Sequence, residues 1–321
     1  KKAFLLKYLK PIEQEYMFWM KGAESLCEER NEIKRVVRMP DGSVLNRYWD
    51  DEAGARPESY REDMALLHVA KPADESMFFR NIRAACESGW DFSSRWLGDD
   101  NSLASIRTTR IIPIDLNCLL FKQENLIAEY YEAVGDTQMS QRYVGYAQKR
   151  KNAINQYMWS AAHQIFVDYD LDSTDCSVNS CESTLRKLSL AGVLPLFVGL
   201  ANREQGKHVA TILEEKFMQA GGLVTTLDET GQQWDSPNGW APLHWFAIEG
   251  LRHYQHEQLA NVISERWLQT VTTFFEQSGK LMEKYDVCHQ QRAATGGEYQ
   301  VQEGFGWTNG VYQALRNKSG V

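Results

Sequence analysis

The sequence has no excess of positive charge and no long apolar run, and these two absences exclude several kinds of partner. Its 321 residues contain 35 Lys and Arg against 43 Asp and Glu, which gives a net charge of −8. No basic face is available to neutralise phosphates or anionic lipids, so we expect neither nucleic acid nor a membrane as a partner. No apolar stretch reaches the roughly 18 to 20 residues that cross a bilayer. A small neutral ligand fits this composition better.

Cysteine is scarce and lacks the spacing of a metal site. The six cysteines form no C-x-x-C pair and have no histidines at zinc-finger distances, so we expect no metal. Cys86 and Cys118 lie in apolar helical stretches, where we expect inert free thiols in the core. Cys176 and Cys181 lie close together in a polar loop and are the pair that can form a bridge. A bridge there would indicate an oxidising compartment, whereas six free thiols would indicate the cytoplasm.

Apolar residues recur mainly at spacings of three and four, which is typical of amphipathic helices. Short extended segments flank Asp41-Gly42 and predict a hairpin over 36–48, and the alternation at 165–169 predicts another. Because no strand run is long enough for a parallel sheet, we expect one all-α domain over residues 1–321, an α/α toroid, with an irregular bundle as the alternative. The predicted helices lie at 12–20, 59–69, 76–87, 116–127, 137–159, 184–201, 204–219, 241–254, 259–274 and 310–317.

Four loops concentrate Trp, Gly, Asp and Glu. Indole faces stack on the C–H faces of a sugar and carboxylates accept hydrogen bonds from its hydroxyls, so these loops favour a carbohydrate site. Glycosidic cleavage needs one carboxyl to protonate the leaving oxygen and another to activate water or attack directly. Asp91, between Trp90 and Phe92, fits the first role because partial desolvation favours its protonated form. The four loops are 56–60, 87–96, 232–242 and 283–310.

The residues alone leave other interpretations of these carboxyls open. Asp91 can equally belong to a buried aromatic corner, and Asp235 can simply cap the helix that follows it. Glu283, Glu298 and Glu303 share one loop region. Their spacing does not choose a catalytic base among them.

Three segments resemble motifs of the trehalase family. Residues 233–242, Q-W-D-S-P-N-G-W-A-P, match the family's second signature at every fixed position. Residues 87–96, E-S-G-W-D-F-S-S-R-W, are similar to its catalytic-acid loop, and residues 304–311, G-F-G-W-T-N-G-V, resemble its carboxyl-terminal motif. The likeness extends from the first predicted helix to the last.

The resemblance implies an (α/α)6 toroid that hydrolyses α,α-trehalose to two glucose molecules with inversion and without a metal or cofactor. It makes Asp91 the general acid and Glu283, in the segment E-K-Y-D, the general base. An inverting pair predicts carboxyl groups about 6.5 to 9.5 Å apart. The sugar-binding residues that the resemblance implies are Arg56, Pro57, Glu58, Gly89, Trp234, Trp240 and, on a lid loop, Glu298.

The chain departs from the family pattern in two places. An upstream signature similar to P-G-G-R-F-x-E-x-Y-x-W-D-x-Y is absent, so we expect a toroid without its first helices. The lid, where the family often has a long glycine run, reads A-A-T-G-G at 293–297. Fewer glycines predict a stiffer lid.

Two alternatives to a trehalase stay open, together with the compartment. One is another α/α-toroid α-glucosidase that acts on a different glucoside, and the other is a truncated form that binds sugar without catalysis. The segments E-S-G-W-D-F and E-K-Y-D-V are slightly closer to the periplasmic type of the family. We therefore expect a periplasmic monomer that binds the disaccharide trehalose, with the cytoplasm as the alternative location.

Overall fold

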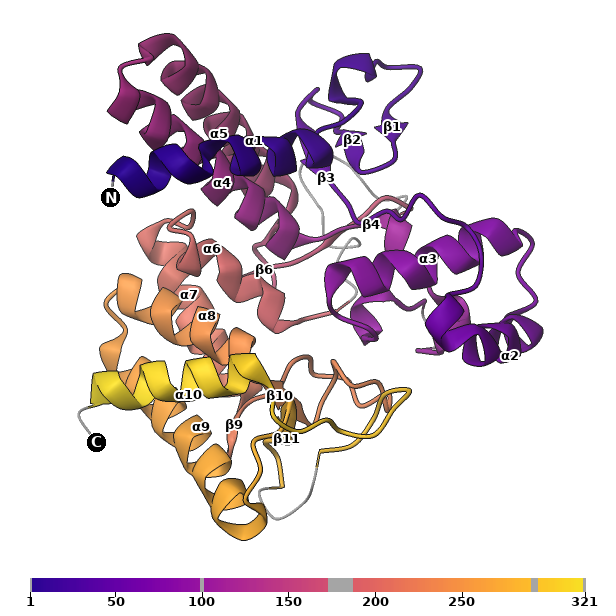
Figure 1. Cartoon of the computed structure of the whole chain (residues 1–321), viewed down its shortest axis with the longest axis vertical. Coiled ribbons are helices and arrows are strands. Elements are labelled where there is room, and N and C mark those ends of the chain that lie inside the picture. Colours follow the sequence, from indigo (N-terminus) through magenta and orange to yellow (C-terminus); the bar gives the residue numbers. More distant parts are fainter. Residues whose placement is uncertain (1, 99–100, 173–186, 290–293, 320–321) are drawn as a thin grey trace.

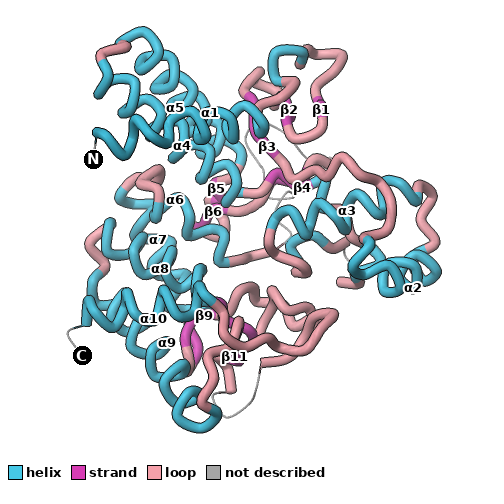
Figure 2. Tube along the Cα trace, in the orientation of Figure 1, coloured by secondary structure: helices cyan, strands magenta, loops and turns pink. Residues whose placement is uncertain are grey.

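Helices form most of the chain, and the strands between them are only two or three residues long (Figure 1 and Figure 2). The computed structural model describes residues 2–98, 101–172, 187–289 and 294–319. The helices are α1 (Lys2–Trp19), α2 (Tyr60–Ala70), α3 (Glu75–Ser88), α4 (Ile114–Val134), α5 (Thr137–Tyr157), α6 (Leu194–Phe197), α7 (Arg203–Ile212), α8 (Ala241–His253), α9 (Glu257–Ser278) and α10 (Gly306–Ser319).

The strands form small antiparallel ladders that fasten loops and build no layered sheet. Strands β1 (Glu32–Ile33), β2 (Val36–Arg38) and β3 (Val44–Asn46) make a three-stranded sheet in that order. The two-stranded ladders pair β4 (Ile111–Ile112) with β7 (Tyr169–Asp170), β5 (Trp159–Ser160) with β6 (Ile165–Phe166), β8 (Met218–Gln219) with β9 (Gly222–Leu223), and β10 (Asn238–Trp240) with β11 (Lys284–Asp286). The prediction of helices with small hairpins is confirmed, and β2 and β3 form the hairpin predicted over 36–48. The segment 165–169 is not a hairpin by itself, because β6 pairs with β5 and β7 pairs with β4.

Local capping explains why consecutive helices fold back on each other. Helix α4 ends at Gly135, whose φ of 89° suits glycine, and the side chain of Asp136 accepts from the Met139 amide at 3.0 Å to begin α5. The two helices then pack along their length, with α1 beside α4 (Figure 1). Helices α8 and α9 form a second such pair near the carboxyl terminus.

One continuous cluster of buried apolar side chains runs from Tyr16 to Leu315. Its largest fully buried members include Trp96, Trp240 and Trp267. Burying such a side chain contributes roughly 1.5 to 3 kcal/mol or more, so these aromatic residues join segments far apart in the sequence. Within the described residues, the structure has no helix that is both long and apolar enough for a membrane span.

The structure differs from the predicted helices in the middle of the chain. The segment predicted as a helix at 204–219 leaves the α-helix at Ile212, passes through a π-helical turn and enters β8. The following turn needs glycine, because Gly222 has a φ of 142° and a Cβ there would lie 2.4 Å from His244 Nε2. Helical periodicity in 204–219 therefore continued past the point at which tertiary packing reverses the chain.

The four described cysteines are free thiols. Cys118 is fully buried, as expected, whereas Cys86 is only half-buried and contacts Arg56. Cys176 and Cys181 lie outside the described residues, so their predicted pairing stays a prediction.

Candidate active site

The turn after α3 presents Asp91. Gly89 caps the helix with a φ of 76°, and its amide donates to the Cys86 carbonyl at 3.0 Å. This left-handed conformation favours glycine. A Cβ built on Gly89 would meet no atom within 4 Å, so its backbone faces open space. The turn leads through buried Trp90 to a half-buried Asp91.

The surroundings of Asp91 favour its protonated form. Burial raises the pKa of this carboxyl, and the negative charges of Glu298 and Glu283 raise it further, against the opposing charge of Arg56. Both glutamates therefore lie within electrostatic range of Asp91. A proton held among other carboxylates suits a general acid.

Asp235 joins the loop of Asp91 to the Q-W-D signature loop. Its fully buried carboxylate accepts hydrogen bonds from Ser93 Oγ at 3.0 Å and from the amide and hydroxyl of Ser94 at 2.9 and 2.8 Å. It also accepts from the hydroxyls of Thr226 and Thr230, which precede it in the chain. The interpretation of Asp235 as a cap of α8 is wrong, because the N-cap of α8 is Trp240 and no side chain caps this helix.

Three tryptophans stack behind the site. Trp234 lies between Trp90, at a centroid distance of 5.1 Å, and Trp240, at 3.9 Å with the rings parallel within 1°. Trp234 is 5% exposed and Trp240 is 1% exposed. Both faces of Trp234 are therefore covered by other indoles.

The three glutamates that spacing could not separate have different surroundings in the structure. Glu283 is 1% exposed and lies next to β11. Glu298 is partly exposed and accepts from Arg56 Nη2 at 3.0 and 3.1 Å. Glu303 is exposed and pairs with Lys280 at the surface. Of the three, Glu283 and Glu298 lie near Asp91.

Backbone contacts hold Glu283 in place. Its amide donates to the Gln302 carbonyl at 3.0 Å, and Trp307 Nε1 donates to its carbonyl at 3.3 Å. Thr308 Oγ1 donates to the preceding Met282 carbonyl at 2.7 Å. The segment G-F-G-W-T-N at the start of α10 therefore fixes the backbone that carries this carboxylate.

Lys284 and Gln233 connect the two carboxyl loops, although we did not predict either as a functional residue. Lys284 Nζ donates to Glu283 Oε1 at 3.0 Å and to Gln233 Oε1 at 2.8 Å. Gln233 Nε2 in turn donates to the Asp91 carbonyl oxygen and to Tyr299 Oη, the latter at 3.1 Å. Both residues lie inside motifs that the sequence already displayed, Q-W-D and E-K-Y-D, so their position in those motifs was the available signal.

Arg56 connects the R-P-E segment to Glu298. Arg56 is 5% exposed, and its guanidinium also donates from Nη2 to Asp63 Oδ1 at 2.6 Å. Pro57 and Glu58 are exposed at the start of a short 3-10 turn, and no hydrogen bond among the described residues joins them to the other predicted site residues. The structure thus brings Arg56 to the site and leaves its two neighbours at the surface.

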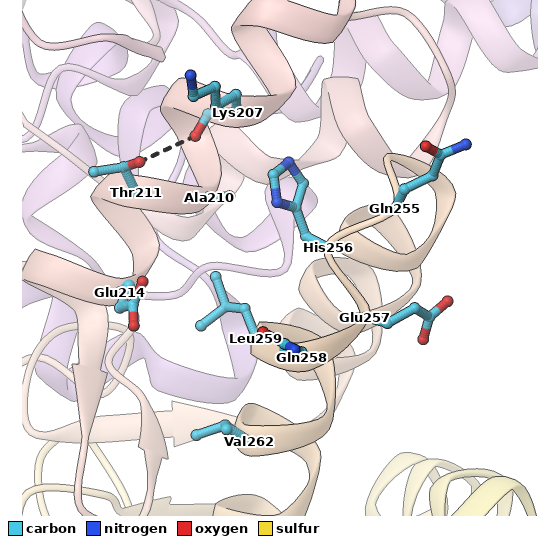
Figure 3. A pocket seen from close by; sticks show the side chains of 10 residues that line it. All are labelled: Lys207, Ala210, Thr211, Glu214, Gln255, His256, Glu257, Gln258, Leu259 and Val262. Atoms are coloured by element: carbon cyan, nitrogen blue, oxygen red, sulfur yellow. Dashed lines mark hydrogen bonds between the residues drawn. The ribbon is translucent and has the colours of Figure 1, made fainter.

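A cavity of about 590 Å³ lies away from these carboxyls, between α7 and the start of α9 (Figure 3). Side chains of both charge signs surround it, including Lys207, Glu214 and Glu257. Neither Asp91 nor Glu283 lines it, so this cavity is separate from the carboxyl pair. No group of three or more His, Cys, Asp or Glu side chains in the described ranges is arranged to hold a metal ion.

Paired helices that present a carboxyl pair among tryptophans place this chain in the class of α/α-toroid glycoside-hydrolase folds. A sequence model of the family described as Trehalase matches residues 1–319. The chain belongs to the trehalase family, as the sequence motifs predicted.

Solved structures confirm the predicted (α/α)6 toroid. Neutral trehalase Nth1 from Saccharomyces cerevisiae is 25% identical with a TM-score of 0.71, and the match covers 95% of this chain and 57% of that one. A mannosylglycerate hydrolase from Thermus thermophilus is 18% identical with a TM-score of 0.51, covering 84% and 55%. A sialidase is 16% identical with a TM-score of 0.58, covering 92% and 23%. The last two share the fold alone, and this chain spans little more than half of the yeast enzyme.

Proposed function

We propose that this chain hydrolyses α,α-trehalose to two glucose molecules with inversion at one anomeric carbon. One observation carries the proposal: Asp91 has a raised pKa and lies within electrostatic range of Glu283, a second and deeply buried carboxylate. Among the described residues no hydrogen bond joins the two carboxyl groups. Inversion is taken from the resemblance to the trehalase family, and it requires the two carboxyl groups to lie about 6.5 to 9.5 Å apart, with room for a water molecule.

Asp91 is the general acid in this proposal. Its raised pKa keeps the carboxyl protonated closer to neutral pH than an ordinary aspartate. It donates its proton to the glycosidic oxygen as the bond from that oxygen to the anomeric carbon breaks. The first glucose then leaves with the α configuration that it had in trehalose.

Glu283 is the general base. Its Oε1 accepts from Lys284, which leaves Oε2 to accept a proton from water. The water oxygen attacks the anomeric carbon on the face opposite the leaving group, and the second glucose forms as the β anomer. Asp91 releases one proton to the leaving oxygen and Glu283 accepts one from water, so the step requires no further reactant.

The remaining predicted residues divide between binding and support. We assign Glu298, Arg56 and the open backbone at Gly89 to the sugar hydroxyls, because all three adjoin Asp91 or the residues that contact it. Trp234 and Trp240 act as a support behind the site, since their stacked faces leave no indole plane for a sugar. Pro57 and Glu58 lie on the exposed side of this region.

The test is glucose release from trehalose by this 321-residue chain, followed by NMR of the anomers at early times. Equal initial amounts of α- and β-glucose are expected, with slow or no release from maltose as the specificity control. Two equivalents of α-glucose would contradict inversion. Binding of trehalose without release would support the non-catalytic alternative, and faster cleavage of maltose would support a different α-glucosidase.

We also propose a periplasmic location. The test is whether Cys176 and Cys181 are paired, because a disulfide indicates an oxidising compartment. Alkylation of the denatured chain without reductant, followed by mass spectrometry, should label four thiols and leave these two unlabelled. Labelling of all six would indicate the cytoplasm instead.

A further inference from the structure

Lys284 is a lysine with no exposed side-chain surface, and it lies between the two carboxyl-bearing loops. Strand β11 begins at this residue, and the ladder sets it opposite Trp240 in β10. Its ammonium nitrogen is 5.4 Å from the Trp240 ring centroid and 5.7 Å from that of Tyr299. A buried ammonium is costly unless hydrogen bonds and charges compensate it, so its partners indicate why it is there.

The hydrogen bonds of Lys284 form one connected path from the Glu283 carboxylate to the backbone of Asp91. The path runs from Glu283 Oε1 to Lys284 Nζ at 3.0 Å and on to Gln233 Oε1 at 2.8 Å. The side-chain amide nitrogen of Gln233 continues it to the backbone carbonyl oxygen of Asp91. Glu283 and Asp91 are 192 positions apart in the chain, and two side chains join them.

The charged and titratable groups around Lys284 come from three separate segments. Glu283 adjoins it in sequence, Asp91 comes from the turn after α3, and Tyr299 comes from the 294–305 loop. Burial lowers the pKa of Lys284, while the charges of Glu283 and Asp91 oppose that shift. Arg56 and Glu298 also act electrostatically on Asp91.

We infer that Lys284, acting through Gln233, is a positioning residue that holds the Glu283 carboxylate relative to the backbone of Asp91 and thereby sets the separation of the two carboxyl groups. This inference rests on the proposed trehalose hydrolysis. A methionine of similar length would fill the same space against Trp240, so packing alone does not require a cation. The ammonium is needed because it alone can donate to both oxygens at once.

The first experiment compares Lys284→Met and Gln233→Leu with the wild-type chain in trehalose hydrolysis. Each variant should lower kcat by roughly 100-fold with KM changed less than threefold, because a misplaced pair affects the transition state more than binding. The double variant should be no slower than the slower single variant, since both changes break one path. Lys318→Met, at the exposed end of α10, is the matched control and should keep wild-type kcat.

The pH profile separates positioning from packing. Loss of the ammonium removes a positive charge near both carboxyls, so both limbs of the kcat profile of Lys284→Met should move to higher pH. A loss of packing alone would lower kcat and leave the limbs in place. Additive effects of the two single variants, or unshifted limbs, would overturn the inference while the wild-type enzyme still cleaves trehalose.

A second measurement tests the same path without catalysis. Urea unfolding of Lys284→Met, Glu283→Leu and the double variant should show that the double variant loses less stability than the two single losses combined. A wild-type chain that releases no glucose would refute the proposed function, yet this coupling would still be measurable. Strict additivity in unfolding would overturn the inference whatever the activity.

Discussion

Two regions of the molecule bury a glutamate beside a cation, and they differ in what surrounds the pair. Glu124 and Glu283 are each 1% exposed. Glu124 pairs with Arg150 at 3.0 Å and Glu283 pairs with Lys284 at the same distance. The first pair joins helices α4 and α5, whereas the second lies where loops meet beside β11.

The Glu124 region is a hydrogen-bonded network between helices. Arg150 donates through Nη1 to Asn46 and Asn117, both at 2.9 Å, and through Nε to Glu124 at 3.0 Å. Tyr16 Oη donates to the same carboxylate at 3.0 Å. These groups come from α1, β3, α4 and α5, so the network ties the amino-terminal helices together.

The Glu283 region contains the same components beside further carboxyls. The pKa of Glu124 is raised by burial, as is that of Asp91. Neither a buried ion pair nor a raised pKa by itself therefore indicates chemistry. The difference is that Asp91 has two other carboxylates, Glu283 and Glu298, within electrostatic range, whereas Glu124 has a cation and neutral side chains around it.

The largest expected effect is the loss of kcat when the proposed acid in the Glu283 region is replaced. Asp91→Asn should lower kcat for trehalose by roughly 10³- to 10⁴-fold with KM nearly unchanged, because the amide cannot donate an acidic proton. Initial rates of glucose release measure it. A residual kcat within tenfold of wild type would remove Asp91 from the role of acid and end the distinction between the regions.

Arg150→Met, in the Glu124 region, should reduce stability and leave kcat nearly unchanged. Removing the cation leaves Glu124 buried and unpaired, which should reduce the free energy of unfolding by about 3 to 5 kcal/mol. Urea unfolding measures the loss, and kcat of the folded protein should stay near wild type. Lys149→Met, an exposed neighbour on α5, is the control and should change stability by less than about 0.5 kcal/mol. A tenfold loss of kcat in folded Arg150→Met would show that the two regions are coupled.

Glu298→Gln should raise KM about tenfold and change kcat less, because its proposed task is to hold hydroxyls. Steady-state kinetics with trehalose measure both constants. Glu303→Gln, an exposed glutamate in the same loop region, serves as the control and should leave KM unchanged. An unchanged KM in Glu298→Gln would place this carboxylate outside the binding site.

The smallest effect is on the pH dependence of stability. The folded pKa of Asp91 lies above its usual value of 3.8, so the folded state keeps a proton that the unfolded state releases. Wild-type stability therefore falls as pH rises from that value through the folded pKa, and Asp91→Asn removes this fall. The gain of Asp91→Asn in urea midpoint over wild type should be larger at pH 7 than at pH 4.5. An equal gain at both values would contradict the raised pKa.

The spacing of apolar residues was sufficient to predict helices whose formation depends on residues close together in the sequence. The spacing of three and four predicted the helices around 116–127, 137–159 and 241–254, which the structure contains as α4, α5 and α8. It failed at 204–219, where the reversal at Gly222 depends on His244. Helical periodicity records which face of a segment is apolar, but it contains no information about where a distant segment makes the chain turn.

The sequence by itself determined the helical fold class, the family and Asp91 as the candidate acid, because these follow from periodicity and from motifs contiguous in the chain. The tertiary structure alone showed that Glu283 is buried and Glu303 exposed, gave Asp235 its place between two loops, and joined Lys284 to Asp91 through Gln233. Burial and charge coupling depend on residues that come together only when the chain folds. The spacing of carboxylates along a loop therefore could not assign their roles.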